Sequence, residues 1–119
     1  MANYVDGFVL PVLKKDVDAY RRIARKAGKV WMEHGALEYK ECVAEDVPTG
    51  KVTSFPRSVK RKQNETVVFA WITYKSRAHR DRVNKKVMSD PRLAEMEEKD
   101  MPADMKRLIY GGFEVIVDL

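Results

Sequence analysis

The chain has few of the residues that build metal sites and disulfides. Its 119 residues include a single cysteine, Cys42, and two histidines, His34 and His79. A lone cysteine excludes an internal disulfide framework and any metal site made of several cysteines. Such sparse use of cysteine is typical of reducing compartments. We therefore expect a cytoplasmic protein without a bound metal ion.

Long apolar runs, leader sequences and cofactor motifs are also missing. No apolar run approaches the ~20 residues that a membrane-spanning helix needs. Residues 1–7 lack the basic and then apolar pattern of a signal peptide. The chain shows neither a Ser-His-Asp signature nor the glycine fingerprint of a dinucleotide-binding domain. We expect no membrane partner and no cofactor.

Length and composition fit a single domain over residues 1–119. Hydrophobic residues make up 45% and charged residues 34% of the chain, and a chain of this length can bury one core without disulfides. The net charge of +5 is mild, and the basic residues concentrate at 57–62 and 75–86. Such clusters can meet an anionic partner, but base-stacking aromatic residues are not interleaved with them. Nucleic acid is therefore an unlikely partner, and a solvated surface is the simpler interpretation.

The pattern of β-branched, aromatic and periodic apolar residues predicts an α+β fold with the order strand, helix, strand, strand, helix, strand. This is the ferredoxin-like βαββαβ arrangement, in which right-handed crossovers place both helices on one face of a four-stranded antiparallel sheet. The expected strands are 4–13, 36–45, 66–74 and 113–117. The first expected helix spans 16–34, and the second runs from the N-cap Ser76 to about Ser89. A short third helix is expected to begin at Pro91 and to be broken at Met101-Pro102.

Several residues mark the ends of the first helix. Asp16 and Asp18 lie in its first turn, where carboxylates suit the positive end of the helix dipole. Gly28 inside the helix costs about 1 kcal/mol relative to alanine. Gly35 offers the left-handed cap that ends the helix.

Both faces of the sheet are predicted to be apolar. Alternate residues of a strand point to opposite faces, and in the third strand both sets are apolar: Val67, Phe69 and Trp71 on one face, and Val68, Ala70 and Ile72 on the other. Two helices cover one face only, and an uncovered apolar face usually marks an interface. We expect a second copy to pack on it by two-fold symmetry. The alternative is that the long polar connection 46–65 folds back and covers the face alone.

Several short segments resemble one known family. They are Tyr4-Val5-Asp6-Gly7-Phe8-Val9, His34-Gly35-Ala36-Leu37, Asp46-Val47-Pro48, Val67-Val68-Phe69-Ala70-Trp71-Ile72, Met88-Ser89-Asp90-Pro91-Arg92 and Lys106-Arg107-Leu108-Ile109-Tyr110-Gly111-Gly112. Together, and in this order, they resemble the YbaA-like family of bacterial domains of unknown function. The resemblance implies a dimeric α/β barrel, in which two ferredoxin-like subunits pack sheet to sheet.

The resemblance implies no particular activity. The wider superfamily of dimeric α/β barrels includes enzymes that work without a cofactor and members without known chemistry, so a shared fold transfers no function. The chain also departs from the family pattern. It has Met101-Pro102-Ala103-Asp104 where the family has Met-Pro-Phe-Asp, and relatives carry phenylalanine where His34 stands. Loss of the aromatic ring at Ala103 would open space or change an interface.

The candidate catalytic residues are His34 and Glu41, since either could accept a proton if it lines a pocket. For each there is a structural alternative: His34 would cap the first helix, and Glu41 would pair with an arginine across the interface. The candidate ligand-binding residues are Trp31, Tyr39, Trp71, Asn84 and Asp6. The alternative for the two polar members of that set is that they satisfy backbone groups or lie in water.

Other residues are expected to be structural. Cys42 is expected to be a small buried hydrophobic residue. His79 is expected to be exposed, because it lies in a run of charged residues. Gly111 and Gly112 lack the following helix of a phosphate loop, so we expect them to bend the strand or admit a close neighbour. The six methionines are expected to fill the core.

Three functional hypotheses follow. The first is a homodimer that binds a small molecule between sheet and helices, either as a binding protein or as an enzyme without a cofactor. The second is a structural or regulatory dimer whose basic loop 46–65 recruits an acidic protein partner. The third is RNA binding through 57–62 and the second helix.

Overall fold

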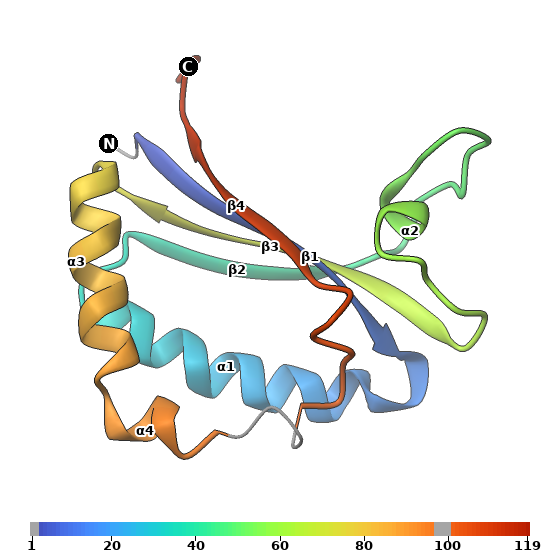
Figure 1. Ribbon diagram of the computed structural model, residues 1–119, viewed down its shortest axis with the longest axis horizontal. Coiled ribbons are helices and arrows are strands. Elements are labelled where there is room, and N and C mark those ends of the chain that lie inside the picture. The colour runs from blue at the N-terminus through green and yellow to red at the C-terminus, as the bar shows by residue number, and fades with distance from the viewer. Residues whose placement is uncertain (1–2, 97–100) are drawn as a thin grey trace.

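The computed structural model describes residues 3–96 and 101–119 and shows a four-stranded antiparallel sheet with its two long helices on one face (Figure 1). The strands stand in the order β2-β3-β1-β4, and all three pairings are antiparallel. The predicted ferredoxin-like α+β fold is therefore confirmed. The strands are β1 (Tyr4–Leu13), β2 (Glu38–Val43), β3 (Glu65–Tyr74) and β4 (Ile109–Glu114), and the helices are α1 (Val17–Glu33, after a 3-10 turn at Lys14–Asp16), α2 (Phe55–Ser58), α3 (Arg77–Met88) and α4 (Pro91–Ala94).

The ends of the helices follow the local signals. Gly35 ends α1 with a φ of +112°, in the region that favours glycine. The Ser76 hydroxyl accepts a hydrogen bond from His79 N (3.0 Å) and caps α3. The expectation of an exposed His79 is wrong, because its ring is half-buried beside Tyr74 and its Nδ1 accepts from Lys75 N. Burial is the main cause that lowers the pKa of His79.

The predicted position of the last strand is wrong. β4 starts at Ile109, and both glycines lie inside it rather than before it. Gly112 pairs with Asp6 across the sheet, and a Cβ at Gly112 would collide with the Tyr4 hydroxyl. Gly112 therefore admits a close neighbour, as one of the two expectations had it, whereas a Cβ at Gly111 would make only an ordinary contact with Phe113. The same ladder continues past β4, since Val115 N donates to Asn3 O (2.9 Å).

The long connection 46–65 contains α2 and covers one end of the second sheet face. Val59 is buried there against Val9 and Val67. Farther along the same face Phe69 and Phe113 remain 42% and 63% exposed. The loop therefore does not cover the face alone.

The other face of the sheet packs against α1, which runs beneath it in Figure 1, and against α3, which stands at the left of the same view. The described residues form two buried clusters there, one around Leu10 and Tyr20 and one around Val30 and Tyr74. None of the described helices is long and apolar enough to cross a bilayer. The two clusters leave a hollow between them, which is the candidate site.

Candidate functional site

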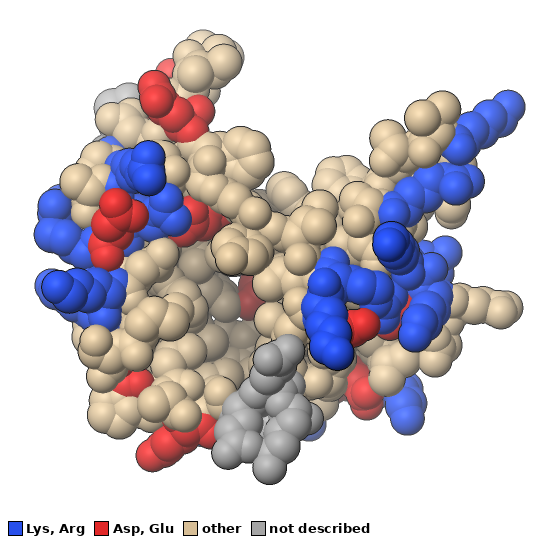
Figure 2. Space-filling view, viewed as in Figure 1, with Lys and Arg blue, Asp and Glu red and all other residues tan. Residues whose placement is uncertain are grey.

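A cavity of about 750 Å³ lies between the sheet and the helices. Ligand pockets commonly measure ~300–1,000 Å³, so a small organic molecule would fit. Figure 2 looks into a hollow at the middle of this face of the molecule. Side chains of all four strands, of α1, α3 and α4, and of the segment before β4 line it, and most of them are apolar or aromatic.

Small side chains keep this space open. Ala24 and Ala27 of α1 and Ala70 of β3 are among the lining residues. Four of the six methionines also line the cavity: Met88, Met96, Met101 and Met105. The expectation that methionines only fill the core is therefore too narrow. Their flexible thioethers can adapt to the shape of a bound molecule.

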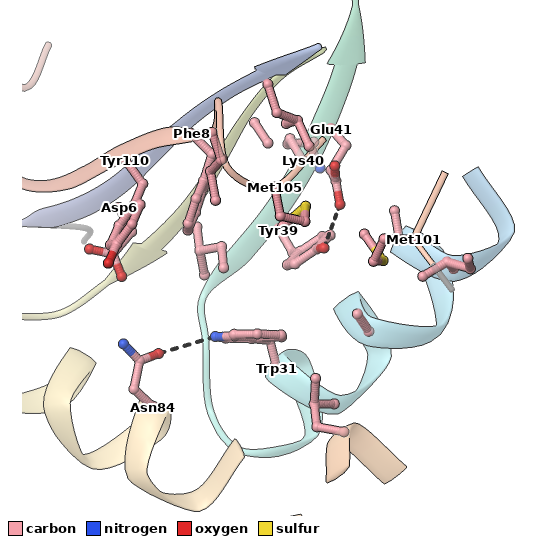
Figure 3. A pocket seen from close by; sticks show the side chains of 18 of the residues that line it. Asp6, Phe8, Trp31, Tyr39, Lys40, Glu41, Asn84, Met101, Met105 and Tyr110 are labelled. Atoms are coloured by element: carbon pink, nitrogen blue, oxygen red, sulfur yellow. Dashed lines mark hydrogen bonds between the residues drawn. The ribbon is translucent and has the colours of Figure 1, made fainter. Parts of the chain in front are cut away.

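One end of the cavity holds a carboxylate between two tyrosines. Glu41 accepts hydrogen bonds from the hydroxyls of Tyr20 and Tyr39, the latter at 2.5 Å (Figure 3). Burial, and next the charge of Glu41, raises the pKa of both tyrosines well above the ordinary range. Both phenols therefore stay protonated and donate, and both oxygens of Glu41 are engaged.

The other end of the cavity is a second polar group around Asp6, which is 6% exposed. Arg80 Nη1 lies 3.3 Å from Asp6 Oδ1. Asn84 Oδ1 accepts from Trp31 Nε1 (3.2 Å) and from the Tyr74 hydroxyl (3.3 Å). Burial raises the pKa of Asp6, and the Arg80 charge and an Asn84 hydrogen bond oppose that rise.

Four of the five candidate ligand-binding residues line this cavity: Trp31, Tyr39, Asn84 and Asp6. Trp71 is not among the described lining residues. It points to the opposite face of the sheet, where its Nε1 donates to Glu38 Oε1 (2.7 Å).

The two candidate catalytic residues lie in different parts of the structure. Glu41 lines the cavity, whereas the described lining does not include His34. His34 instead lies at the C-cap of α1, with its Nε2 2.8 Å from Asp90 Oδ2. Asp90 is the N-cap of α4, and the hydrogen bonds from Arg92 and then His34 lower its pKa. The contact ties the end of α1 to the start of α4.

Cys42 is exposed, so the expectation of a buried thiol is wrong for the single chain. Neighbouring residues of a strand face opposite ways. Because Glu41 turns to the helices, Cys42 turns to the open face, where it pairs with Phe69 of β3. Only a covering partner would bury it.

Tyr20 and Arg80 belong to the site although the sequence did not single them out for it. Tyr20 recurs with Ala24 and Ala27 at spacings of four and three, so it shares an apolar helix face with them, where a tyrosine is normally part of the core. Arg80 lies in a run of charged residues, which is typical of a solvated surface. The signal that could have found both is the need of the half-buried Glu41 and the buried Asp6 for hydrogen-bond donors.

Two arginines of the basic loop 46–65 donate hydrogen bonds to backbone carbonyl groups of the same loop. Arg57 donates to the carbonyls of Thr49 and Gly50, and Arg61 donates to Glu65 O. Lys60 and Lys62 are exposed. Figure 2 shows Lys and Arg side chains gathered on the side of the molecule where the α2 loop lies.

The model of a family described as "Protein of unknown function (DUF1428)" matches residues 3–105. The chain belongs to this family. It is 56% identical over 116 residues to the uncharacterized protein YbaA of Escherichia coli K12, and the match covers 98% of each chain. The YbaA protein of Shigella flexneri matches equally well. The resemblance stated from the sequence is confirmed, and this DUF1428 member inherits no assigned activity from these relatives.

One solved structure supports the fold of this DUF1428 member. A dimeric ferredoxin-like protein from an uncultured marine organism superposes with a TM-score of 0.51 and covers 98% of this chain and 99% of its own. Its sequence is only 12% identical, so the similarity shows the fold alone.

Proposed function

We propose that this protein is a homodimer that binds a small, largely apolar molecule in the cavity between the sheet and the helices. The observation that carries the proposal is the cavity of about 750 Å³, whose apolar wall has a polar group at each end. A closed core would have no need for such a space, since protein interiors are close-packed. We also propose that residues 1–119 act as one domain and that the protein is cytoplasmic, because its sparse use of cysteine fits a reducing compartment.

The open sheet face supports the homodimer. Phe69, Ile109 and Phe113 are 42–63% exposed there, next to Trp71. Exposed apolar patches of this kind mark interfaces. The ferredoxin-like neighbour is itself described as dimeric. A second copy placed face to face would cover this surface and leave the cavity on the far side of each sheet free for a ligand.

Two tryptophans on opposite faces of the sheet allow a direct test. Trp31 lines the cavity and Trp71 does not. Para-bromobiphenyl, an apolar molecule whose bromine quenches tryptophan at contact range, serves as the probe. In a Trp71→Phe variant it should quench the remaining Trp31 in a saturable way. In the matched Trp31→Phe variant it should leave Trp71 unquenched. Equal quenching in both variants, or none in either, would contradict the proposal.

An enzymatic role for Glu41 ranks second within the same site. Glu41 lines the cavity, but both of its oxygens already accept hydrogen bonds from tyrosines. Each oxygen keeps a second lone pair, through which Glu41 could accept a proton from a bound molecule. Substrate turnover that is lost in Glu41→Gln and retained in His34→Phe would establish that role.

A second function is recruitment of an acidic protein through the basic loop. The exposed ammonium groups of Lys60 and Lys62 favour it. A Lys60→Glu, Lys62→Glu variant leaves Arg57 and Arg61, which hold the loop together, unchanged. It should lose such a partner while its circular dichroism stays the same. Retained capture of the partner would rule out this use of the loop.

A further inference from the structure

The Asp6 end of the cavity has an acceptor without a donor. Among the residues that the structure describes, no group donates a hydrogen bond to Asp6 Oδ1. Arg80 Nη1 lies 3.3 Å away, close enough for charge attraction but outside hydrogen-bond geometry. Buried carboxylate oxygens normally have donors, and those that lack one point to a role.

Asn84 cannot easily be rearranged to supply that donor. Its Oδ1 already accepts from Trp31 Nε1 and from the Tyr74 hydroxyl, which fixes the orientation of the amide. Figure 3 shows the oxygen turned to Trp31 and the nitrogen turned to the side of Asp6. The amide nitrogen therefore faces Asp6, in agreement with its effect on the pKa of that carboxyl, but among the described residues it makes no hydrogen bond with Oδ1. Oδ1 remains without a donor.

The surroundings restrict what can supply it. A cationic ligand would be repelled by the Arg80 guanidinium, and an anionic ligand by the Asp6 carboxylate. A neutral hydroxyl meets neither penalty. The wall beside Asp6 is aromatic, with Phe8 and Tyr110 stacked at a centroid distance of 6.2 Å and Trp31 opposite. Aromatic faces and thioethers favour a flat ring.

We propose that the cavity binds a neutral aromatic hydroxyl compound, whose O–H donates to Asp6 Oδ1 while its rings lie against Phe8, Trp31 and Tyr110. This rests on the proposed function and names its ligand class. At the Glu41 end each carboxylate oxygen already has a tyrosine donor, whereas Asp6 Oδ1 has none among the described residues.

A matched pair of probes tests the hydroxyl directly. Para-hydroxybiphenyl and para-methylbiphenyl have nearly the same shape, but only the first can donate a hydrogen bond. The methyl compound is the more apolar and would bind more tightly to a purely apolar wall. Isothermal titration calorimetry should instead show the hydroxyl compound binding at least about tenfold more tightly, because hydrogen bonds to charged groups are the strong ones.

An Asp6→Asn variant locates the effect. The neutral amide oxygen is a weaker acceptor, so the preference for the hydroxyl compound should shrink by about tenfold. Affinity for para-methylbiphenyl should be unchanged, which also shows that the variant is folded. The control is Asp18→Asn, since Asp18 is an exposed carboxylate on α1 that pairs with Arg21. It should keep the full preference.

The outcomes separate the two proposals. Equal affinity of the intact protein for both probes, or a preference for the methyl compound, would overturn the hydroxyl inference and leave the cavity as a binding site. An unchanged preference in Asp6→Asn would likewise overturn the role of Asp6. Binding of neither probe would count against the proposed function itself and remove this inference with it.

Discussion

Gly28 of α1 lies against the ring of Tyr39 of β2, so close that a Cβ at position 28 would fall 2.7 Å from two ring atoms. The absence of a side chain lets Tyr39 lie flat on the helix and reach Glu41 with its hydroxyl. A glycine that costs the helix about 1 kcal/mol therefore shapes one wall of the cavity.

A Gly28→Ala substitution should destabilise the protein although alanine is the better helix former. The collision with Tyr39 outweighs the gain in propensity, because overpacking typically costs ~1–3 kcal/mol. We expect urea denaturation to show a loss of about 1 kcal/mol. In a Tyr39→Ala background the same substitution should become stabilising. A stabilising effect in the intact protein would contradict the close packing described here.

The buried pair of Glu65 and Arg107 should make stability depend on pH. Two bonds of 2.8 and 2.6 Å join the groups, and Arg107 lowers the pKa of Glu65 below its usual 4.5. This stabilisation is present above pH 4.5 and is lost as the pH falls through the pKa of the folded state.

Arg107→Met should therefore lose about 3 kcal/mol at neutral pH, since it leaves the buried Glu65 carboxylate without its cation and with the Lys62 N–H as its remaining described donor. Urea denaturation at successive pH values should show the gap to the intact protein narrowing below pH 4.5. Arg21→Met, which breaks an exposed ion pair with Asp18, is the control and should change little. A gap that stays constant down to low pH would show that Glu65 does not contribute through this pair.

His34→Phe should leave ligand binding unchanged. His34 contacts Asp90 and lies outside the described lining of the cavity, and Asp90 keeps its cap contact and its bonds to Arg92. Affinity for para-bromobiphenyl, measured through Trp31, should match that of the intact protein. Asp90→Ala should lower the melting temperature more than His34→Phe does, because it also removes the N-cap of α4. Loss of binding in His34→Phe would contradict this prediction and show that His34 contributes to the binding site.

A Phe69→Glu substitution should produce a folded monomer. It places a charge on the open sheet face, beside Cys42, without touching the helix side. Sedimentation velocity should show half the mass of the intact protein, and the Cys42 thiol should react faster with a thiol reagent. Lys29→Glu on the exposed side of α1 should remain a dimer with a slow thiol. A dimeric Phe69→Glu protein would mean that the copies meet elsewhere.

The sequence predicted the fold better than the site. The unbroken apolar run from Val67 to Ile72 predicted that both faces of the sheet are apolar, because side-chain direction follows from strand geometry alone. The same rule said that Glu41 and Cys42 face apart, but not which of them meets the helices. That depends on the pairing register of β2 with β3, which no local pattern encodes.

Hydrogen bonds between side chains far apart in the sequence could not be predicted for the same reason. Tyr20 reaches Glu41 across 21 positions and Trp31 reaches Asn84 across 53. The two tryptophans looked alike in the sequence, yet Trp71 lies on the opposite face of the sheet. The start of β4 was missed because glycines usually interrupt strands, whereas Gly112 is required here by the Tyr4 hydroxyl.

Native mass spectrometry of the protein as purified from its own host tests the central claim most directly. We expect a dimer in which each subunit carries an additional small mass, released on denaturation and identifiable as an aromatic hydroxyl compound. A monomer would contradict the interface on the open sheet face. A dimer that stays empty even when para-hydroxybiphenyl is added would contradict the cavity as a binding site.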